Sequence, residues 1–319
     1  RVTYYKNIIN LEVSHSLTDA SGTTMFFKTL VSNYLKLKYD IQTEEEIDKS
    51  SIYEKSEDAF KKYYKKPGKF NFYFSRNAYK IKLEDYSDYR IRIIDATTST
   101  SKIIELSKKY QCSISIYITS ILIHSILLQM TEREKKRPIF ITLPVNLRRF
   151  FPSNTIRNFF YAVSIRYKSN GEDKIEDIIS NVKEQFEKNL TKEKMYEKMS
   201  ETLFLENVFI LRLVPRALKD FVLKTSFDIS RKKHTMSFSN IGAISMPKVF
   251  EPYIEAFSFY SSTDGIQLNC CSYLDKFKFS FSSHFINAEI EKNFTRYLSE
   301  QGFEIYIDEN ILDEDEKLN

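Results

Sequence analysis

The chain has 319 residues, of which 42% are hydrophobic and 29% charged, a composition typical of globular proteins and unlike that of a disordered chain. Its net charge of +5 is spread over interleaved acidic and basic residues, which does not favour a nucleic-acid-binding protein. A chain of this length exceeds one usual core, so we expect one large domain or two closely packed domains.

Cysteine and glycine usage limits the chemistry. Cys112, Cys270 and Cys271 have no zinc-ligand spacing, and the adjacent pair is poorly placed to bridge, so we expect a cytoplasmic protein without a metal site. The six glycines lie far apart, which excludes a phosphate-binding loop, a dinucleotide fingerprint and a G-x-S-x-G elbow. No signal peptide is recognisable, and the start at Arg1 leads us to expect that an N-terminal part is missing.

The first residues predict a strand followed by a helix. Residues 4–15 end in an alternation that places His15 on the apolar face, so we expect its side chain to point towards the core. Helical periodicity follows Gly22, with one apolar row at residues 26, 30 and 34 and a second at 27, 31 and 35.

Residues 40–86 are charged, with a short helix predicted near 54–64 and a turn at Pro67–Gly68. We interpret this stretch as a linker. It divides the chain into an N-terminal part, residues 1–86, and a second unit, residues 87–319.

The second unit predicts alternating groups of strands and helices. The expected strands are at 90–95, 139–147, 158–167, 234–242, 253–262, 266–274, 276–285 and 303–307. The expected helices are at 98–111, 113–130 and 287–300, with two or three more between 173 and 225. The apolar stretch 113–130 is interrupted by polar residues and reads as a buried core helix, not a membrane span. This order indicates an α/β sandwich with a mixed sheet.

The four histidines differ in context. His124 lies within the apolar helix, where a hydrogen-bonded core imidazole is expected. His284 shares the polar face of a strand with Ser280 and Ser282 and is expected to be solvated, and His234 carries no signal. Only His15 combines a core-directed side chain with the junction between a strand and a helix.

The stretch SHSLTDASG, residues 14–22, pairs His15 with Asp19. A neutral imidazole can take a proton from an alcohol or amine at neutral pH, and an aspartate one turn later can orient it or hold the turn. An ordinary strand-to-helix turn with two polar residues is the alternative, because a motif of this size arises readily by chance.

Two distant segments accompany that stretch, LPVNLRRFFPSNTIRNFF at 143–160 and MSFSNIGAISMP at 236–247. The ordered set resembles the chloramphenicol-acetyltransferase-like superfamily, which includes HxxxD acyltransferases, alcohol acetyltransferases and condensation domains. The single histidine and the SNIG segment look most like the bacterial alcohol acetyltransferase and condensation-type branch.

The resemblance implies two α/β sandwich halves with mixed sheets and a tunnel between them, and we expect the first half to be truncated. It implies transfer of an acyl group from a coenzyme A or carrier-protein thioester, as co-substrate, to a small alcohol or amine acceptor, with no tightly bound cofactor. His15 is then the general base, and Asp19 forms a structural ion pair with Arg148.

Further site residues follow from the same resemblance. Ser237, Ser239 and Asn240 become candidates for oxyanion or substrate binding, with the satisfaction of local backbone groups at a strand end as the alternative. Asn158 matches a position that shapes the same region, and Arg157 stands where glycine is commoner.

The sequence also departs from the pattern. Ser14 replaces the first histidine of condensation domains, which favours a plain acyltransferase over peptide condensation. Ala20 replaces the glycine after the aspartate, a change expected to alter the turn. The DFGWG segment of the plant branch is absent. A catalytically silent binding or docking module of the same fold is therefore the alternative function.

Overall fold

A computed structural model describes residues 1–65, 77–86, 90–207, 233–261 and 265–310, and a few single residues or pairs between 215 and 225. The turn predicted at Pro67–Gly68 lies outside the described residues, as does part of the helical region predicted at 173–225.

The chain opens with an antiparallel hairpin of β1 (Val2–Tyr5) and β2 (Ile8–Leu11). At its turn Lys6 has a φ of 51°, a left-handed conformation that reverses the chain. The single strand predicted over residues 4–15 is therefore wrong, because the turn divides it and no strand continues past Leu11 to His15. Val2, Tyr4, Tyr5 and Ile8 of the hairpin are exposed.

The predicted helix after the hairpin is α1 (Ala20–Tyr39). Asp19 caps its start by accepting a hydrogen bond from the backbone N–H of Gly22 at 3.1 Å. Of the two predicted apolar rows, Val31 and Leu35 of the second are buried, whereas Phe26 and Tyr34 of the first are exposed. The buried row packs against a small cluster that includes Ile244, Met246, Phe250, Phe257, Cys271 and Tyr273.

Two short helices follow, α2 (Ile52–Ser56) and α3 (Ala59–Tyr63). Ser51 and Glu54 form a capping box at the start of α2, which satisfies backbone N–H groups that a short helix leaves free. Ala59 and Tyr79 are buried in the main core cluster, so residues before position 86 pack against the large sheet. The division at residue 86 stays a prediction.

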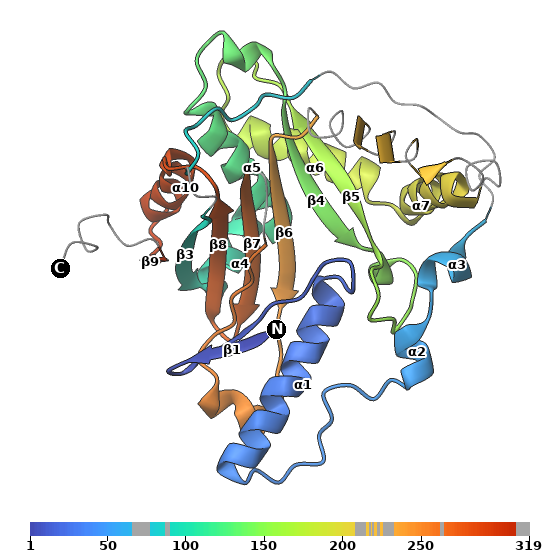
Figure 1. Ribbon diagram of the computed structural model, residues 1–319. Helices are drawn as coiled ribbons and strands as arrows, with labels where there is room; N and C mark the ends of the chain where they lie inside the picture. Colours follow the sequence, from blue (N-terminus) through green and yellow to red (C-terminus); the bar gives the residue numbers. More distant parts are fainter. Residues whose placement is uncertain are drawn as a thin grey trace.

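Seven strands form one mixed sheet in the order β5-β4-β6-β7-β8-β3-β9 (Figure 1). They are β3 (Arg92–Ser99), β4 (Ile139–Asn146), β5 (Phe160–Tyr167), β6 (Met236–Ala243), β7 (Ile266–Tyr273), β8 (Lys276–Ser283) and β9 (Tyr306–Glu309). The pairs β4–β6 and β6–β7 are parallel and the other pairs are antiparallel. Parallel pairing brings the carboxyl ends of β4 and β6 to the same edge of the sheet, beside the start of α1 (Figure 1).

One face of the sheet forms the main core. Alternate side chains of the central strands, such as Ile141, Phe238, Leu268 and Phe279, are fully buried there. The helices of the second unit are α4 (Thr100–Lys109), α5 (Ile114–Leu127), α6 (Ile175–Asn189), α7 (Lys192–Asn207) and α10 (Glu289–Glu300), with short 3-10 turns η1 (Glu134–Lys136), η2 (Leu147–Arg149) and η3 (Lys248–Tyr253). Helices α4, α5, α6 and α10 lie behind the sheet in Figure 1 and cover this face.

The other face of the sheet is polar and partly covered. Asp95 of β3 forms an ion pair with Lys278 of β8 at 3.3 Å and accepts a hydrogen bond from the hydroxyl of Tyr260 at 2.7 Å. The strand predicted at 253–262 is wrong, because residues 254–261 have no regular structure. Contacts such as that of Tyr260 hold them over the sheet instead.

This covering segment accounts for a second error. Ser280 and Ser282, predicted to lie on a solvated face of β8, are each 1% exposed, and His284 is partly buried. Alternation reports which residues share a face, but it does not report whether another segment covers that face.

The arrangement confirms the predicted α/β class with a mixed sheet. Within the described residues it comprises one sheet-and-helix sandwich, preceded by the hairpin and α1. No single described helix is long and apolar enough to cross a membrane; α4 and α5 satisfy the length and composition criteria only jointly, as a pair bent by 84°.

Candidate active site

Residues 14–19 form a connecting segment between the hairpin and α1, here called the His15 strap. The backbone N–H of Leu17 donates to the carbonyl of Ser14 at 2.9 Å, which tightens the strap into a turn. The expectation that His15 points towards the core is wrong: the residue is exposed. Its ring lies 5.2 Å from the ring of Phe160, measured between centroids.

Asp19 anchors the end of the strap and is only 5% exposed. Its Oδ1 accepts from the N–H of Gly22, while its Oδ2 accepts from Phe159 N–H at 2.8 Å and from Nη1 of Arg148 at 2.7 Å. Three donors thus compensate the buried carboxylate. They lie in α1 (Gly22), directly before β5 (Phe159) and in η2 (Arg148).

Arg148 contacts more than Asp19. Its Nε and Nη2 donate to the carbonyl of Thr155 at 3.0 and 2.8 Å, and Nη2 also donates to the carbonyl of Arg157 at 2.7 Å. The guanidinium lies 5.9 Å from the ring centroid of Phe159. Arg148 therefore ties the start of α1 to the loop before β5, a role that uses the planar fork of an arginine.

Two further contacts hold the strap and the start of α1 in place. Asn158 donates from Nδ2 to the carbonyl of His15 at 2.9 Å, and Asn146 at the end of β4 donates to Ser21 Oγ at 2.9 Å. Asn146 was not among the predicted site residues, although it lies inside the segment PVNLR. These contacts hold the backbone at His15 and at the first turn of α1.

Gly22 lets α1 approach the loop before β5. A Cβ at this position would overlap with the backbone oxygen of Ile156 and with the hydroxyl of Thr18, and that hydroxyl itself donates to the oxygen of Ile156. Ala20, which stands where glycine is expected, is the first residue of α1 and carries no positive φ. The position at which only glycine lets α1 approach the backbone of Ile156 is thus Gly22, two residues after Ala20.

The residues singled out on β6 form contacts of their own. Asn240 accepts from Gly242 N–H at 2.9 Å and donates to Ser115 Oγ of α5 at 3.1 Å. A register shift lies between Asn240 and Gly242, and Gly242 has a φ of 88°, which favours glycine. These contacts match the local alternative for Asn240. Ser239 is 9% exposed.

His234 precedes β6 and joins Ser237 in a polar group that the sequence did not reveal. Its Nδ1 lies 2.9 Å from Thr142 Oγ1 and its Nε2 lies 3.3 Å from Ser237 Oγ. Burial, and then the charge of Lys80, lower the pKa of His234 to about 4. The imidazole is therefore neutral at physiological pH.

Among the contacts given above, those of His15, Asp19, Arg148 and Asn158 form one connected set. Ser237 and Asn240 contact His234 and Ser115 instead. His124 was expected to be hydrogen-bonded, but its Nδ1 has no partner in the part of the chain that the structure describes; burial lowers its pKa.

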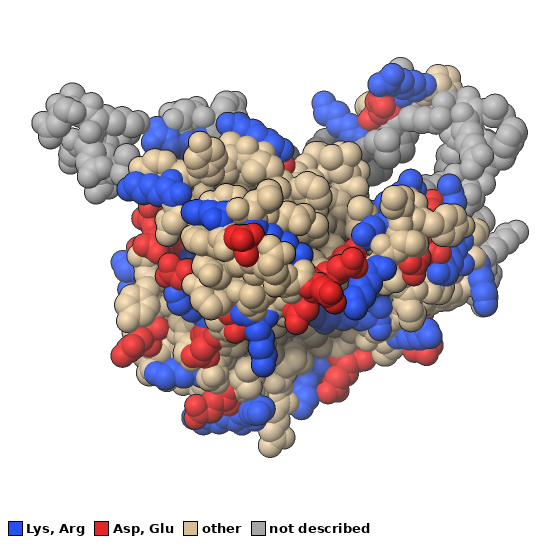
Figure 2. All heavy atoms as spheres, turned by 90° about the horizontal axis from the view of Figure 1, so that it is seen from below, with Lys and Arg blue, Asp and Glu red and all other residues tan. Residues whose placement is uncertain are grey.

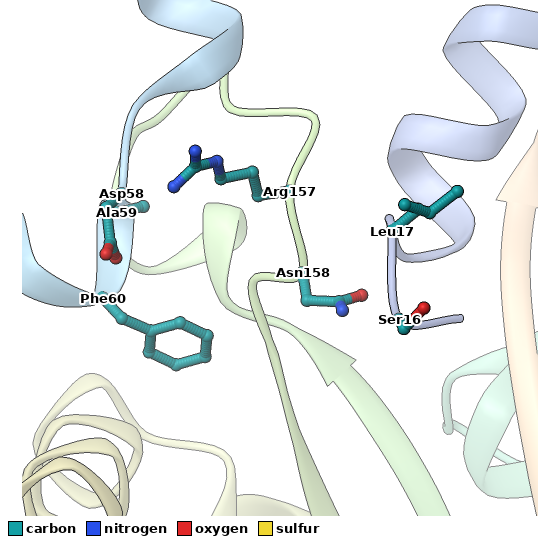
Figure 3. A pocket seen from close by; sticks show the side chains of 7 residues that line it. All are labelled: Ser16, Leu17, Asp58, Ala59, Phe60, Arg157 and Asn158. Carbon is teal, nitrogen blue, oxygen red and sulfur yellow. The ribbon is translucent and has the colours of Figure 1, made fainter. Parts of the chain in front are cut away.

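A cleft of about 350 Å³ opens next to the His15 strap (Figure 3). Its walls are the strap, the start of α3 and the loop before β5. The lining residues are Ser16, Leu17, Asp58, Ala59, Phe60, Arg157 and Asn158. No group of three or more His, Cys, Asp or Glu residues suited to a metal ion occurs among the described residues.

Charge is mixed on the surface. In the view from below, Figure 2 shows basic and acidic side chains interleaved, without a continuous area of one sign. This face offers no extended cationic surface of the kind that neutralises a polyphosphate backbone.

No protein-family model matches the sequence, and no curated protein sequence matches it. Solved structures do share the fold. The epimerization domain from the third module of tyrocidine synthetase B superposes with a TM-score of 0.50 at 9% identity, over 90% of this chain and 66% of that domain. Polyketide synthase associated protein 5 from Mycobacterium tuberculosis gives 0.52 at 13% identity, over 89% and 71%.

The nonribosomal peptide synthetase FmoA3 gives a TM-score of 0.52 at 11% identity, over 91% of this chain and 30% of that one. This chain spans 66% of the epimerization domain, so it corresponds to part of that fold. At these identities the likeness concerns the fold alone. The chain has the mixed α/β fold that its motifs implied, and it shares this fold with the epimerization domain and with polyketide synthase associated protein 5.

Proposed function

We propose that the chain transfers an acyl group from a thioester of coenzyme A or of a carrier protein to an alcohol or amine, with His15 as the general base. The observation that carries the proposal is the connected set around the strap. The ion pair of buried Asp19 with Arg148 and the amide of Asn158, which donates to the carbonyl of His15, hold the backbone at and after His15, while its imidazole stays open to solvent.

The chemistry requires one proton to move twice. The imidazole takes the proton of the acceptor O–H or N–H as the oxygen or nitrogen attacks the thioester carbonyl. The tetrahedral intermediate then expels the thiolate, which takes the proton back from the imidazolium. The products are the ester or amide and the free thiol, and no metal or redox partner is needed.

An exposed histidine makes this proposal testable without loss of the fold. We expect His15→Ala to leave the circular dichroism spectrum and the melting temperature unchanged, because His15 is exposed and its ring contact is with the half-buried Phe160. We expect its thiol release from acyl-CoA donors, tested with a panel of small alcohols and amines, to fall about 100-fold or more. His284→Ala is the control for loss of a histidine elsewhere, since His284 follows the last residue of β8 and does not line the cleft beside the strap.

Two results would contradict the proposal. One is a folded His15→Ala protein that releases thiol at the rate of the unaltered chain. The other is an unaltered chain that releases no thiol with any donor and acceptor in the panel, which would favour the catalytically silent docking module.

A further inference from the structure

The cleft beside the His15 strap has three kinds of wall. Leu17, Ala59 and Phe60 provide apolar surface, Arg157 provides a cation, and Asn158 provides an amide (Figure 3). A volume of about 350 Å³ lies within the range of small-molecule sites. Leu17 is 71% exposed, so a ligand in the cleft would cover apolar surface that water now contacts.

The positive charge of Arg157 is available to a ligand. Within the described part of the chain its guanidinium has no ion pair, and Arg157 is exposed. Asp58 is the single carboxylate among the lining residues. That carboxylate accepts from Lys61 N–H at 3.1 Å and pairs with Lys61 Nζ at 3.2 Å, so a cation of its own element already lies beside it.

Asn158 presents an acceptor without a donor. Its Nδ2 is used on the carbonyl of His15, which orients the amide. Its Oδ1 is buried, and no donor among the described residues reaches it. Figure 3 shows the amide lying between Arg157 and Ser16. A buried acceptor left unsatisfied is costly, and a ligand N–H or O–H would satisfy it.

We propose that this cleft binds the acyl acceptor and that Arg157 selects acceptors that carry a carboxylate. The ligand chemistry follows from the walls: an anionic group at Arg157, an N–H or O–H donor at Asn158, and an apolar body against Leu17 and Phe60. An amine or alcohol acceptor brings the required donor with it. The inference rests on the proposed acyl transfer, which it deepens by naming the acceptor class.

The position of the cleft fits the acceptor better than the donor. Ser16 and Leu17 follow His15 directly, and the amide that would hold the ligand also holds the His15 backbone. A complete coenzyme A thioester is larger than a site of this volume. Its phosphates are nevertheless anions that Arg157 would attract, so the test must separate the two sources.

Binding is measured by calorimetry on the full chain in the absence of any thioester. The probes are leucine and its hydroxy analogue 2-hydroxyisocaproate, each beside the carboxamide that lacks the carboxylate charge, and inorganic phosphate. The variants are Arg157→Gln, with Arg149→Gln as matched control, since Arg149 is an exposed arginine outside the cleft lining. His15→Ala is included to separate binding from catalysis.

We expect the unaltered chain, Arg149→Gln and His15→Ala to bind a carboxylate probe more tightly than its carboxamide. Arg157→Gln should lose about tenfold in affinity for the carboxylate and bind both members of the pair equally. Because binding is measured without a thioester, this result would stand even if no acyl transfer were found. Failure of the proposed function can therefore be told apart from failure of the binding inference.

Three results would overturn the inference. The unaltered chain shows no preference for the carboxylate, or the preference survives in Arg157→Gln. In the third, phosphate binds through Arg157 but a carboxylate is not preferred over its carboxamide. Arg157 would then bind the phosphates of the thioester donor and not the acceptor.

Discussion

Arg148 and Asp19 lie 129 positions apart in the chain, yet Nη1 of the arginine contacts Oδ2 of the aspartate at 2.7 Å. Their side chains are 14% and 6% exposed, so the pair is largely buried. The same arginine holds the loop before β5, and the same aspartate caps α1. One pair of charges thus joins the three segments that surround the His15 strap.

Removal of Arg148 should be strongly destabilising. Arg148→Ala leaves a buried carboxylate with two backbone donors and no cation, and it releases the carbonyl of Thr155. We expect the free energy of unfolding, from urea titration, to fall by about 3–5 kcal/mol. Arg149→Ala, on the exposed neighbour, should change it by less than about 0.5 kcal/mol. Equal midpoints for the two variants would show that the ion pair contributes nothing to stability.

A methyl group at position 22 should push α1 away from the loop before β5. Gly22→Ala introduces an overlap with backbone atoms of Ile156, which cannot move as a side-chain end can. We expect a loss of unfolding free energy on the order of 1–3 kcal/mol. Gly265→Ala is the matched control, because a Cβ there meets nothing within 4 Å. A Gly22→Ala protein as stable as Gly265→Ala would argue against the close approach.

Glu291 of α10 should make the protein less stable as pH rises towards neutrality. The residue is 2% exposed, and burial raises its pKa from 4.5 to about 7. Between these values the folded state binds the proton and the unfolded state does not, so unfolding free energy falls with rising pH. Glu291→Gln should remove this loss, roughly 3 kcal/mol at pH 7 and above. Melting curves from pH 4 to 8 measure it; parallel curves for the two proteins would refute the shifted pKa.

His234 should act in the opposite direction. Its pKa is lowered from 6.5 to about 4, so between these values the unfolded state binds the extra proton and stability is lost as pH falls. In the unaltered chain the contributions of His234 and Glu291 oppose each other between about pH 4.5 and 6.5. His234→Gln should therefore leave a curve that declines with rising pH, and Glu291→Gln a curve that rises. A histidine variant with an unchanged curve would show that the imidazole titrates normally.

Periodicity was sufficient for most of the fold. The periodicity of α1, the apolar run of α5 and the alternation of β8 are patterns within one element, and each element lies where its pattern indicates. The hairpin was missed because its turn, at Lys6 and Asn7, carries neither glycine nor proline. An alternating run broken by such a turn looks like one strand.

The polar face of the sheet could not be predicted for a different reason. Ser280 and Ser282 alternate as solvated residues do, and their burial depends on a segment that crosses the sheet from elsewhere in the chain. The same holds at the site. The motifs pointed to His15, Asp19 and Arg148, but the exposure of His15, the orphan acceptor of Asn158 and the polar group around His234 depend on tertiary packing.

The long separation of the strap from its anchors also determines when the site can form. The contacts of Asp19 with Arg148 and Phe159, and of His15 with Asn158, span 129, 140 and 143 positions. During synthesis the strap leaves the ribosome long before those partners are made, and closure of so long a loop is slow and entropically unfavourable. The nascent chain therefore carries its histidine for many seconds without the geometry that would make it a base.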